Sequence, residues 1–435
     1  MTGISGCRDP SADQQETQNA APTVSTVPLR VAIVSDADQA EAADLLRGGW
    51  QSVSEQPVKT RTVDLQTYHS SDQAGIKDIG RTSDVVLFPV AASAGMIDSN
   101  AILPISARLS ADSAYDIQSL LSPLQRILTD LGSESFCVPA GCIQPIVAAR
   151  GRAVVAENDA PLRWSDWTLI AQQGGAAEPL AGDWSAYMFL HRASTHVESR
   201  WLFDRDELRS VIAEAPYVAA LQEMAAAAQH YAADARALTP RQAWRRIQTG
   251  ELDAALAWPI GFIESQRKEG VELGPTPVAD QRQQSGDDEV RRFADGTNMM
   301  AAMSVGCRQS DAAIQFIRWV TGNYSMSDMR QGLEGFSISR NESMVSAAGD
   351  VDPMLRDYER LLRGTLGSGR LRIPLRLRQA NRYVSVLADA VRSAIDGADP
   401  ESVLKDCAGK WDALTEEIGL PDQQSVWRRS QGLSR

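Results

Sequence analysis

Strand-like and helix-like segments alternate near the N-terminus, and this order constrains the fold more than any other feature of the chain. Arg30–Val34 and Asp84–Pro89 are apolar runs typical of buried strands, and Val58–Leu65 alternates with a period of two. Residues 37–50 and Ser71–Ile79, which lie between these runs, are predicted helices. A β-α-β-α-β order predicts an α/β fold with a parallel sheet and right-handed crossovers.

The carboxyl ends of these predicted strands are candidate ligand-binding positions. In open parallel sheets, ligands bind outside the carboxyl ends of the strands. Asp36 follows the first strand, and Pro89–Ala91 ends the third. We therefore expect this edge of the sheet to face a ligand.

Residues 136–172 have the features of a connection between two structural units. Pro139 and Pro145 punctuate an extended passage, and Ile146–Val155 is an apolar, strand-like run. Ser165 then caps a predicted helix that opens a new unit. Since 435 residues exceed the size of one ordinary core, the sequence predicts two domains or one large two-lobed unit.

The remainder of the chain is predicted to be mainly helical, with short strands between the helices. A helix that begins at Pro216 carries an apolar stripe, and the capped helix Thr239–Gly250 precedes the strand-like run Leu252–Trp258. The further predicted elements are a strand at Met299–Val305 and helices at Asp311–Val320, 380–396 and 400–418.

Three short motifs point to one known family. Pro161–Trp167 reads P-L-R-W-S-D-W, Leu103–Ile105 reads L-P-I, and residues 239–258 comprise a helix, a glycine, an apolar strand and a tryptophan. In these motifs the chain resembles the extracellular solute-binding proteins of ABC transporters, in their carbohydrate-type branch. The resemblance extends over residues 29–420, but Ala148–Gly151 stands where the family has Tyr-Tyr-Asn.

The resemblance implies an α/β, two-lobed periplasmic-binding-protein-like fold with the ligand cleft between the lobes. It implies a first lobe formed by residues 28–140 and 299–340, and a second lobe formed by residues 141–298 and 341–435. Residues 1–27, which lack aromatic side chains, are expected to form a tether. We expect a protein of this kind to be a monomer.

The resemblance also implies that the protein binds a small solute, expected to be a carbohydrate, and delivers it to the permease of an ABC importer. Aromatic rings would cover the C–H face of a sugar, and polar side chains would satisfy its hydroxyl groups. Trp184, Tyr187 and Trp258 are the aromatic ligand-binding candidates, although each could instead pack beneath the cleft. Asp36 and Asp183 are the acidic candidates.

Two alternative functions and one alternative ligand stay open at this point. The protein could be a ligand-sensing receptor without a transporter, or a secreted hydrolase. Arg150 and Gly151 replace the asparagine of the family, which leaves an acidic or phosphorylated ligand open.

The sequence lacks motifs expected of an enzyme or of a nucleic-acid-binding protein. It has no G-x-S-x-G motif and no glycine-rich phosphate loop after a strand, and its five cysteines and four histidines lack the spacing of a zinc site. Its formal net charge is −13, whereas nucleic-acid binding favours a basic face. We therefore expect a binding protein without catalytic residues, metal or cofactor, and without a nucleic-acid partner.

The segment Ile4–Cys7 has the small-small-Cys pattern at which bacterial lipoproteins are cut and acylated. Only six residues precede Cys7, so the basic and apolar segments of an export signal are absent from the given start. With the family resemblance, we expect Cys7 to carry a lipid anchor that holds the protein at the membrane, in the periplasm or at the cell surface.

Two further features are open to more than one interpretation. Cys137 and Cys142 flank a Pro-Gly turn and could form a disulfide in an oxidising compartment. A basic segment near the C-terminal helices favours a solvated surface, with a docking face for the transporter as the alternative. Its arginines are Arg360, Arg363, Arg370, Arg372, Arg376 and Arg378.

Overall fold

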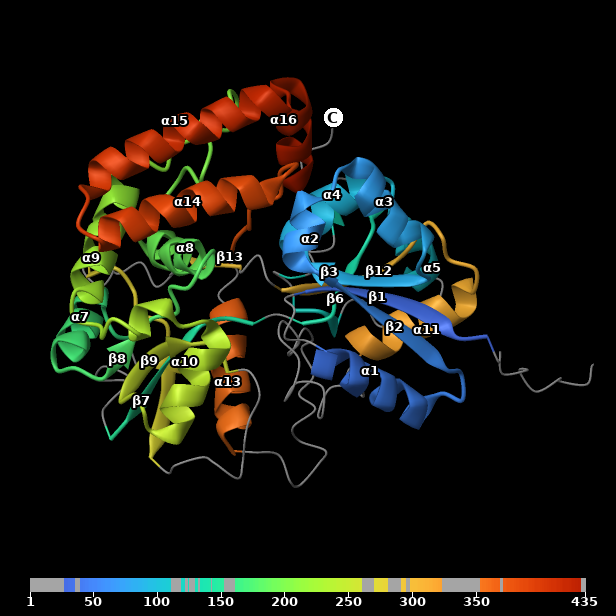
Figure 1. Cartoon of the computed structure of the whole chain (residues 1–435), viewed down its shortest axis with the longest axis horizontal. Coiled ribbons are helices and arrows are strands. Elements are labelled where there is room, and N and C mark those ends of the chain that lie inside the picture. Colours follow the sequence, from blue (N-terminus) through green and yellow to red (C-terminus); the bar gives the residue numbers. More distant parts are fainter. Residues whose placement is uncertain are drawn as a thin grey trace, which may run out of the picture.

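In a computed structural model, the protein consists of two α/β lobes that lie side by side, each with its own sheet (Figure 1). The α/β class and the two-lobed arrangement predicted from the sequence are thus confirmed. No helix among the residues that the structure describes is long and apolar enough to cross a membrane. These residues are 27–35, 40–110, 119–121, 124, 130–131, 134–141, 143–151, 161–259, 270–280, 291–294, 298–322, 353–367 and 371–431.

The first lobe is built on a five-stranded sheet. Its strands are, in spatial order, β2 (Val58–Asp64), β1 (Leu29–Ser35), β3 (Val85–Pro89), β12 (Met299–Met303) and β6 (Val138–Pro139). β1 pairs in parallel with β2 on one side and with β3 on the other, as the β-α-β-α-β order predicts. β12 comes from a distant part of the sequence and runs antiparallel to both β3 and β6.

Helices cover both faces of this sheet (Figure 1). One face carries α1 (Ala40–Val53), α5 (Ser106–Ser110) and α11 (Ser310–Thr321). The other face carries α2 (Leu65–Ser70), α3 (Gln73–Arg81) and α4 (Ser93–Asp98), which follows a short 3-10 turn at Val90–Ala92.

Side chains of β1 alternate between these two helical layers, as the period of two in a strand requires. Ile33 is buried on the side of α1 and α11, and Val34 is buried on the side of α2, α3 and α4. Trp50 of α1 packs edge-on against Phe316 of α11, with 5.2 Å between the ring centroids. The first lobe therefore has a core on each side of its sheet.

The second lobe is built on a four-stranded sheet. Its strands are, in spatial order, β10 (Val271–Pro275), β7 (Ile146–Arg150), β9 (Ala254–Ala257) and β8 (Ala176–Ala177). β7 runs antiparallel to β10 and β9, and β8 runs parallel to β9. Two separate two-stranded sheets are also present. β4 (Asp130–Leu131) pairs with β5 (Glu134–Ser135), and β11 (Arg292–Phe293) pairs with β13 (Leu371–Arg372).

Most of the remaining helices pack in the second lobe (Figure 1). The predicted helices near residues 380–396 and 400–418 are present as α14 (Ala380–Ile395) and α15 (Pro400–Ile418), whereas the sequence does not predict α16 (Leu420–Ser430). The other helices of this lobe are α7 (Trp164–Gln172), α8 (Trp184–His196), α9 (Ala215–Ala228) and α10 (Pro240–Thr249). Helix α13 (Pro353–Gly367) contacts β10, but its Tyr358, Leu362 and Leu366 are buried in the cluster that also contains first-lobe residues.

The chain passes from the first sheet to the second between β6 and β7. In this connection, the backbone N–H of Ile143 donates to the side chain of Asn298 at 2.5 Å. The carbonyl of Asn298 accepts from the N–H of Val90 at 2.8 Å. The hydroxyl of Tyr358 in α13 bonds to the backbone N–H and carbonyl of Gln144, at 3.1 and 3.0 Å. These bonds tie the connection to the end of β3 and to the residue that precedes β12.

Some residues singled out in the sequence lie outside the described part of the chain. They are Cys7 with most of the tether, Asp36 after β1, Cys142, and Arg370 of the basic segment. Cys137, the proposed partner of Cys142, is buried just before β6. The lipid anchor, the ligand contact of Asp36 and the disulfide therefore stay predictions.

The basic segment near the C-terminal helices is only partly the solvated surface that its sequence favours, because Arg360 is exposed whereas other arginines of the segment are packed. Arg376 is fully buried. Arg378 forms ion pairs of 2.6 Å with Asp98 and with Asp422. The prediction is wrong at these two positions because the segment leading into α14 is packed between other elements, where charged side chains require partners.

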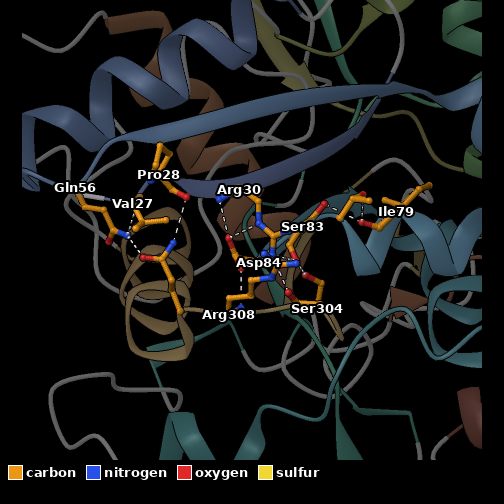
Figure 2. A network of polar contacts seen from close by, with 12 residues as sticks. Val27, Pro28, Arg30, Gln56, Ile79, Ser83, Asp84, Ser304 and Arg308 are labelled. Carbon is orange, nitrogen blue, oxygen red and sulfur yellow. Dashed lines mark hydrogen bonds and ion pairs between the residues drawn. The ribbon is translucent and has the colours of Figure 1, made fainter. Parts of the chain in front are cut away.

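A buried carboxylate joins β1, β3 and the segment after β12 at the amino end of the parallel strands (Figure 2). The side chain of Asp84 accepts from the backbone N–H of Arg30 at 2.9 Å and from its guanidinium group at 2.8 and 3.0 Å. It also accepts from the backbone N–H of Arg308 at 2.8 Å. Arg30 reaches further, to the carbonyl of Gly306 at 2.7 Å. Both oxygens of the carboxylate are therefore satisfied, as a buried charge requires.

Burial by itself raises the pKa of the Asp84 carboxyl, but hydrogen bonds from Arg30 and Arg308 outweigh burial and lower the pKa below its ordinary value. A carboxyl whose pKa is lower in the folded state favours folding when it is ionised. Its contribution is therefore complete above about pH 4 and is lost as the pH falls through the lowered pKa.

We expect Asp84→Asn to lower the free energy of unfolding by about 3 kcal/mol at pH 7, because Arg30 then lacks its counter-charge. The difference from the parent should shrink below about pH 4, where the parent loses the charge as well. Urea denaturation curves across this pH range measure both effects.

The control is Asp44→Asn, which removes the exposed partner of Arg47. Because exposed ion pairs contribute little, this change should cost no more than about 1 kcal/mol. If Asp84→Asn were as stable as Asp44→Asn at pH 7, the structural role assigned to Asp84 would be wrong.

Candidate ligand-binding cavity

A cavity of about 400 Å³ lies between the two lobes. Its volume is within the range of about 300 to 1,000 Å³ that is usual for sites of small ligands. The first lobe contributes residues at and just after the ends of β2 and β3, and the second lobe contributes residues just before and at the start of α8. Thr239, which caps α10, and Ser385 of α14 extend the wall of the second lobe.

The first-lobe wall forms where β2 and β3 end. Asp64 is the last residue of β2, and its side chain caps α2 by accepting from the backbone N–H of Thr67 at 2.8 Å. Pro89 is the last residue of β3, and Ala91 lies in the 3-10 turn after it; both line the cavity. The predicted edge of the sheet, at the carboxyl ends of its parallel strands, thus faces the cavity.

His69 of α2 lines the cavity beside Asp64. Burial lowers the pKa of the imidazole to about 4, although the charge of Asp64 opposes this shift. The ring is therefore uncharged near neutral pH. In this form one ring nitrogen donates a hydrogen bond and the other accepts one.

The second-lobe wall is formed by the turn into α8. Gly182, Asp183, Trp184 and Tyr187 line the cavity here. Gly182 has a φ of 53°, a left-handed conformation that glycine adopts readily and that turns the chain into the helix. The rings of Trp184 and Tyr187 lie 5.6 Å apart between centroids and are inclined by 57°. The sequence-based candidates Asp183, Trp184 and Tyr187 thus lie together on one wall.

Helix α8 is held in place from its buried side. Arg192 pairs with Glu178 at 2.6 Å, and both side chains are fully buried. The same carboxylate oxygen accepts from Tyr231 at 2.6 Å and from the indole of Trp167 at 2.8 Å. Because a buried ion pair needs such additional hydrogen bonds, this cluster allows few positions of α8. It therefore fixes the helix that carries the aromatic wall.

Trp258 lies one layer behind the cavity wall. It is fully buried, and its ring centroid is 5.2 Å from that of Trp184. It also packs against His191, at 5.6 Å between centroids. Trp258 is not among the residues that line the cavity. It packs behind Trp184, which does line the cavity.

Four polar residues of the cavity wall, Asp64, His69, Thr239 and Ser385, were not among the sequence-based candidates. Asp64 could have been found, because the rule that selected Asp36 applies equally to the end of the second predicted strand. His69 could not, because its short helix α2 carries no distinctive pattern. Only the placement of α2 over the end of β2 brings His69 into the wall.

The described part of the cavity wall carries one carboxylate from each lobe, Asp64 and Asp183, and neither lysine nor arginine. Arg150, at the end of β7, is not in this wall. Carboxylates and an uncharged imidazole can bond to hydroxyl groups, and aromatic rings can cover an apolar C–H face. The wall is therefore suited to an uncharged, hydroxyl-rich molecule rather than to an anion.

Comparisons with known proteins identify the fold. No protein-family model and no curated protein matches the sequence. A solute-binding protein of an ABC transporter from Agrobacterium radiobacter K84, solved with ribitol, is 16% identical to the chain with a TM-score of 0.68. It covers 89% of this chain and 100% of its own length.

Two further solved structures have the same architecture. An ABC transporter solute-binding protein from Agrobacterium vitis S4, solved with D-mannitol, has 14% identity and a TM-score of 0.66, covering 90% of this chain and 99% of its own. Maltose-bound MalE3 of T. maritima has 16% identity and a TM-score of 0.64, covering 89% and 100%. All three are binding proteins rather than enzymes. The chain therefore has the two-lobed fold of ABC transporter solute-binding proteins, of the kind that bind sugars and polyols.

Proposed function

We propose that the protein binds a sugar or a polyol in the cavity between its lobes and delivers this solute to an ABC importer. The observation that carries the proposal is the composition of the cavity wall. Trp184 and Tyr187 form its aromatic part, and its polar groups include Asp64, His69 and Asp183. The ribitol, D-mannitol and maltose bound to the similar structures are hydroxyl-rich and uncharged, which matches this wall.

The proposal assigns different tasks to the aromatic and polar groups. Trp184 and Tyr187 cover the carbon face of the solute, and burial of that face drives binding. The carboxylates of Asp64 and Asp183 accept hydrogen bonds from hydroxyl groups. Because these two residues belong to different lobes, a solute that bonds to both holds the lobes together. Ligand-driven closure of the lobes is a common form of domain motion.

The partner and the location are part of the same proposal. The solute passes from the closed lobes to the permease of an ABC importer. Cys7 carries a lipid that holds the protein at the membrane, in the periplasm or at the cell surface, and residues 8–27 act as the tether. The lobe limits given by the sequence, near residues 140 and 299, are the points about which we propose that the lobes move.

Thermal denaturation in the presence of ribitol, D-mannitol and maltose tests the function directly. A solute at one hundred times its dissociation constant should add about 2.7 kcal/mol to the free energy of unfolding. Trp184→Ala should weaken binding of the same solute by about threefold to tenfold, the effect of one lost aromatic contact.

Leu169→Ala is the matched control, because Leu169 lies in the same lobe on α7 and is exposed. This variant should bind as the parent does. A cavity variant that binds every responding solute as tightly as the parent would show that binding takes place elsewhere. A lack of response to a broad set of sugars and polyols would contradict the proposed ligand class.

Trp258→Ala tests the supporting layer. Because Trp258 is fully buried, its removal should lower the free energy of unfolding by about 3 to 5 kcal/mol. Trp184→Ala, at the cavity wall, should cost clearly less. Chemical denaturation of both variants makes the comparison, and equal stabilities would mean that Trp258 is not a core residue.

Membrane attachment can be tested with the gene expressed from its own locus. Cys7→Ser should move the protein from the membrane fraction to the aqueous phase of a detergent partition, because the thiol that accepts the lipid is absent. Cys307→Ser is the control and should stay with the membrane. An aqueous parent protein would contradict the lipid anchor.

A further inference from the structure

An ion-pair cluster bridges the two lobes outside the cavity. Asp98 is the last residue of α4 in the first lobe, and its side chain is only 9% exposed. The guanidinium Nε of Arg378 donates to Asp98 Oδ2 at 2.6 Å, and Arg429 of α16 lies 3.5 Å from the other oxygen. Arg378 and Arg429 both pack with the second lobe, so this carboxylate carries two contacts between the lobes.

The second lobe holds Arg378 in a fixed position. Its Nη1 donates to Asp422 of α16 at 2.6 Å. Its backbone N–H and carbonyl are both bonded by the side chain of the buried Gln423, at 3.0 Å each. A guanidinium group shared by two carboxylates has a fixed fork geometry, so the position of Asp98 relative to α16 is closely defined.

The elements that carry this cluster also line the cavity. On the first-lobe side, Ala92 lines the cavity and α4 runs from the next residue to Asp98. On the second-lobe side, Ser385 lines the cavity and α14 leads back toward Arg378. A smaller hollow of about 50 Å³, lined by Gly95 and by residues near the start of α14, lies between the two elements.

We infer that Asp98 is a positioning residue that sets the separation of the lobes through Arg378 and Arg429, and with it the width of the ligand cavity. Packed helices move as rigid bodies, so a change of spacing at one end of α4 and α14 is transmitted to the other. The ion pairs therefore stabilise the arrangement of lobes seen in this structure over arrangements in which α4 and α16 are apart. This inference does not require any particular ligand.

Single-molecule energy transfer on the ligand-free protein tests the inference. Dyes are attached through unnatural amino acids at Val53 of α1 and Leu169 of α7, which are 62% and 56% exposed and lie in different lobes. At low salt, Asp98→Asn should raise the population outside the main distance peak of the parent by at least about threefold, the scale expected for loss of a coupled ion pair.

Ionic strength provides a second readout that loss of packing would not imitate. Raising the salt concentration from about 0.05 to 1 M shortens the screening length to about 3 Å. Because Arg378 and Arg429 are 28% and 29% exposed, this should shift the parent part of the way toward the Asp98→Asn distribution. The variant, which lacks the charge, should respond much less. Arg378→Lys, which keeps the charge but loses the fork, should give a distribution between the two.

Glu417→Gln is the matched control, because it breaks the pair between Arg382 and Glu417 within the second lobe alone. It should leave the distance distribution as in the parent. If Asp98→Asn folds and gives the parent distribution at low salt, the inference is overturned. It is also overturned if Glu417→Gln changes the distribution as strongly as Asp98→Asn does. Should Asp98→Asn fail to fold, Arg378→Lys decides on the same criterion.

Discussion

The first lobe depends on the pairing of β12 with β3, two strands that lie far apart in the sequence. The register runs from Met299 opposite Pro89 to Met303 opposite Val85. Both strands are buried throughout, and β12 also carries β6 on its other edge. Without β12, β3 would expose an unpaired apolar edge, which folded proteins avoid. The same pairing places Asn298 beside the connection between the lobes and beside the end of β3 that leads into the cavity.

The two ends of the parallel strands use carboxylates in opposite ways. At the amino end, Asp84 is buried and accepts hydrogen bonds from Arg30 and Arg308, so it serves the stability of the sheet. At the carboxyl end, Asp64 is half-buried and lines a cavity. His69 beside it is kept uncharged by its surroundings. The amino end of the strands, where the hydrogen bonds of Asp84 are made within the protein, thus supports the carboxyl end, where Asp64 and His69 face the cavity.

The sequence predicts those features of the structure that neighbouring residues determine, and it does not predict those that depend on residues far away in the sequence. The strands of the first lobe and the helices α14 and α15 follow from local periodicity, and their predicted positions agree closely with the structure. Trp184 and Tyr187 followed from resemblance, which carries information on distant contacts. By contrast, the depth of Trp258 depends on Trp184 covering it, and the burial of Arg376 depends on how the segment before α14 packs. Neither arrangement leaves a pattern in the neighbouring residues.

The central position of β12 has a consequence for how the chain folds. When the ribosome has completed the first three strands of this sheet, the partner that fills the space beside β3 has not yet been made, because the whole of β7, α8 and α9 must be synthesised first. The first lobe therefore cannot reach its final sheet as an independent N-terminal unit. Contacts between such distant segments slow folding, and unpaired strand edges remain exposed during this time. A chaperone that shields the open edge of β3 during synthesis would protect the step at which this protein is most prone to aggregate.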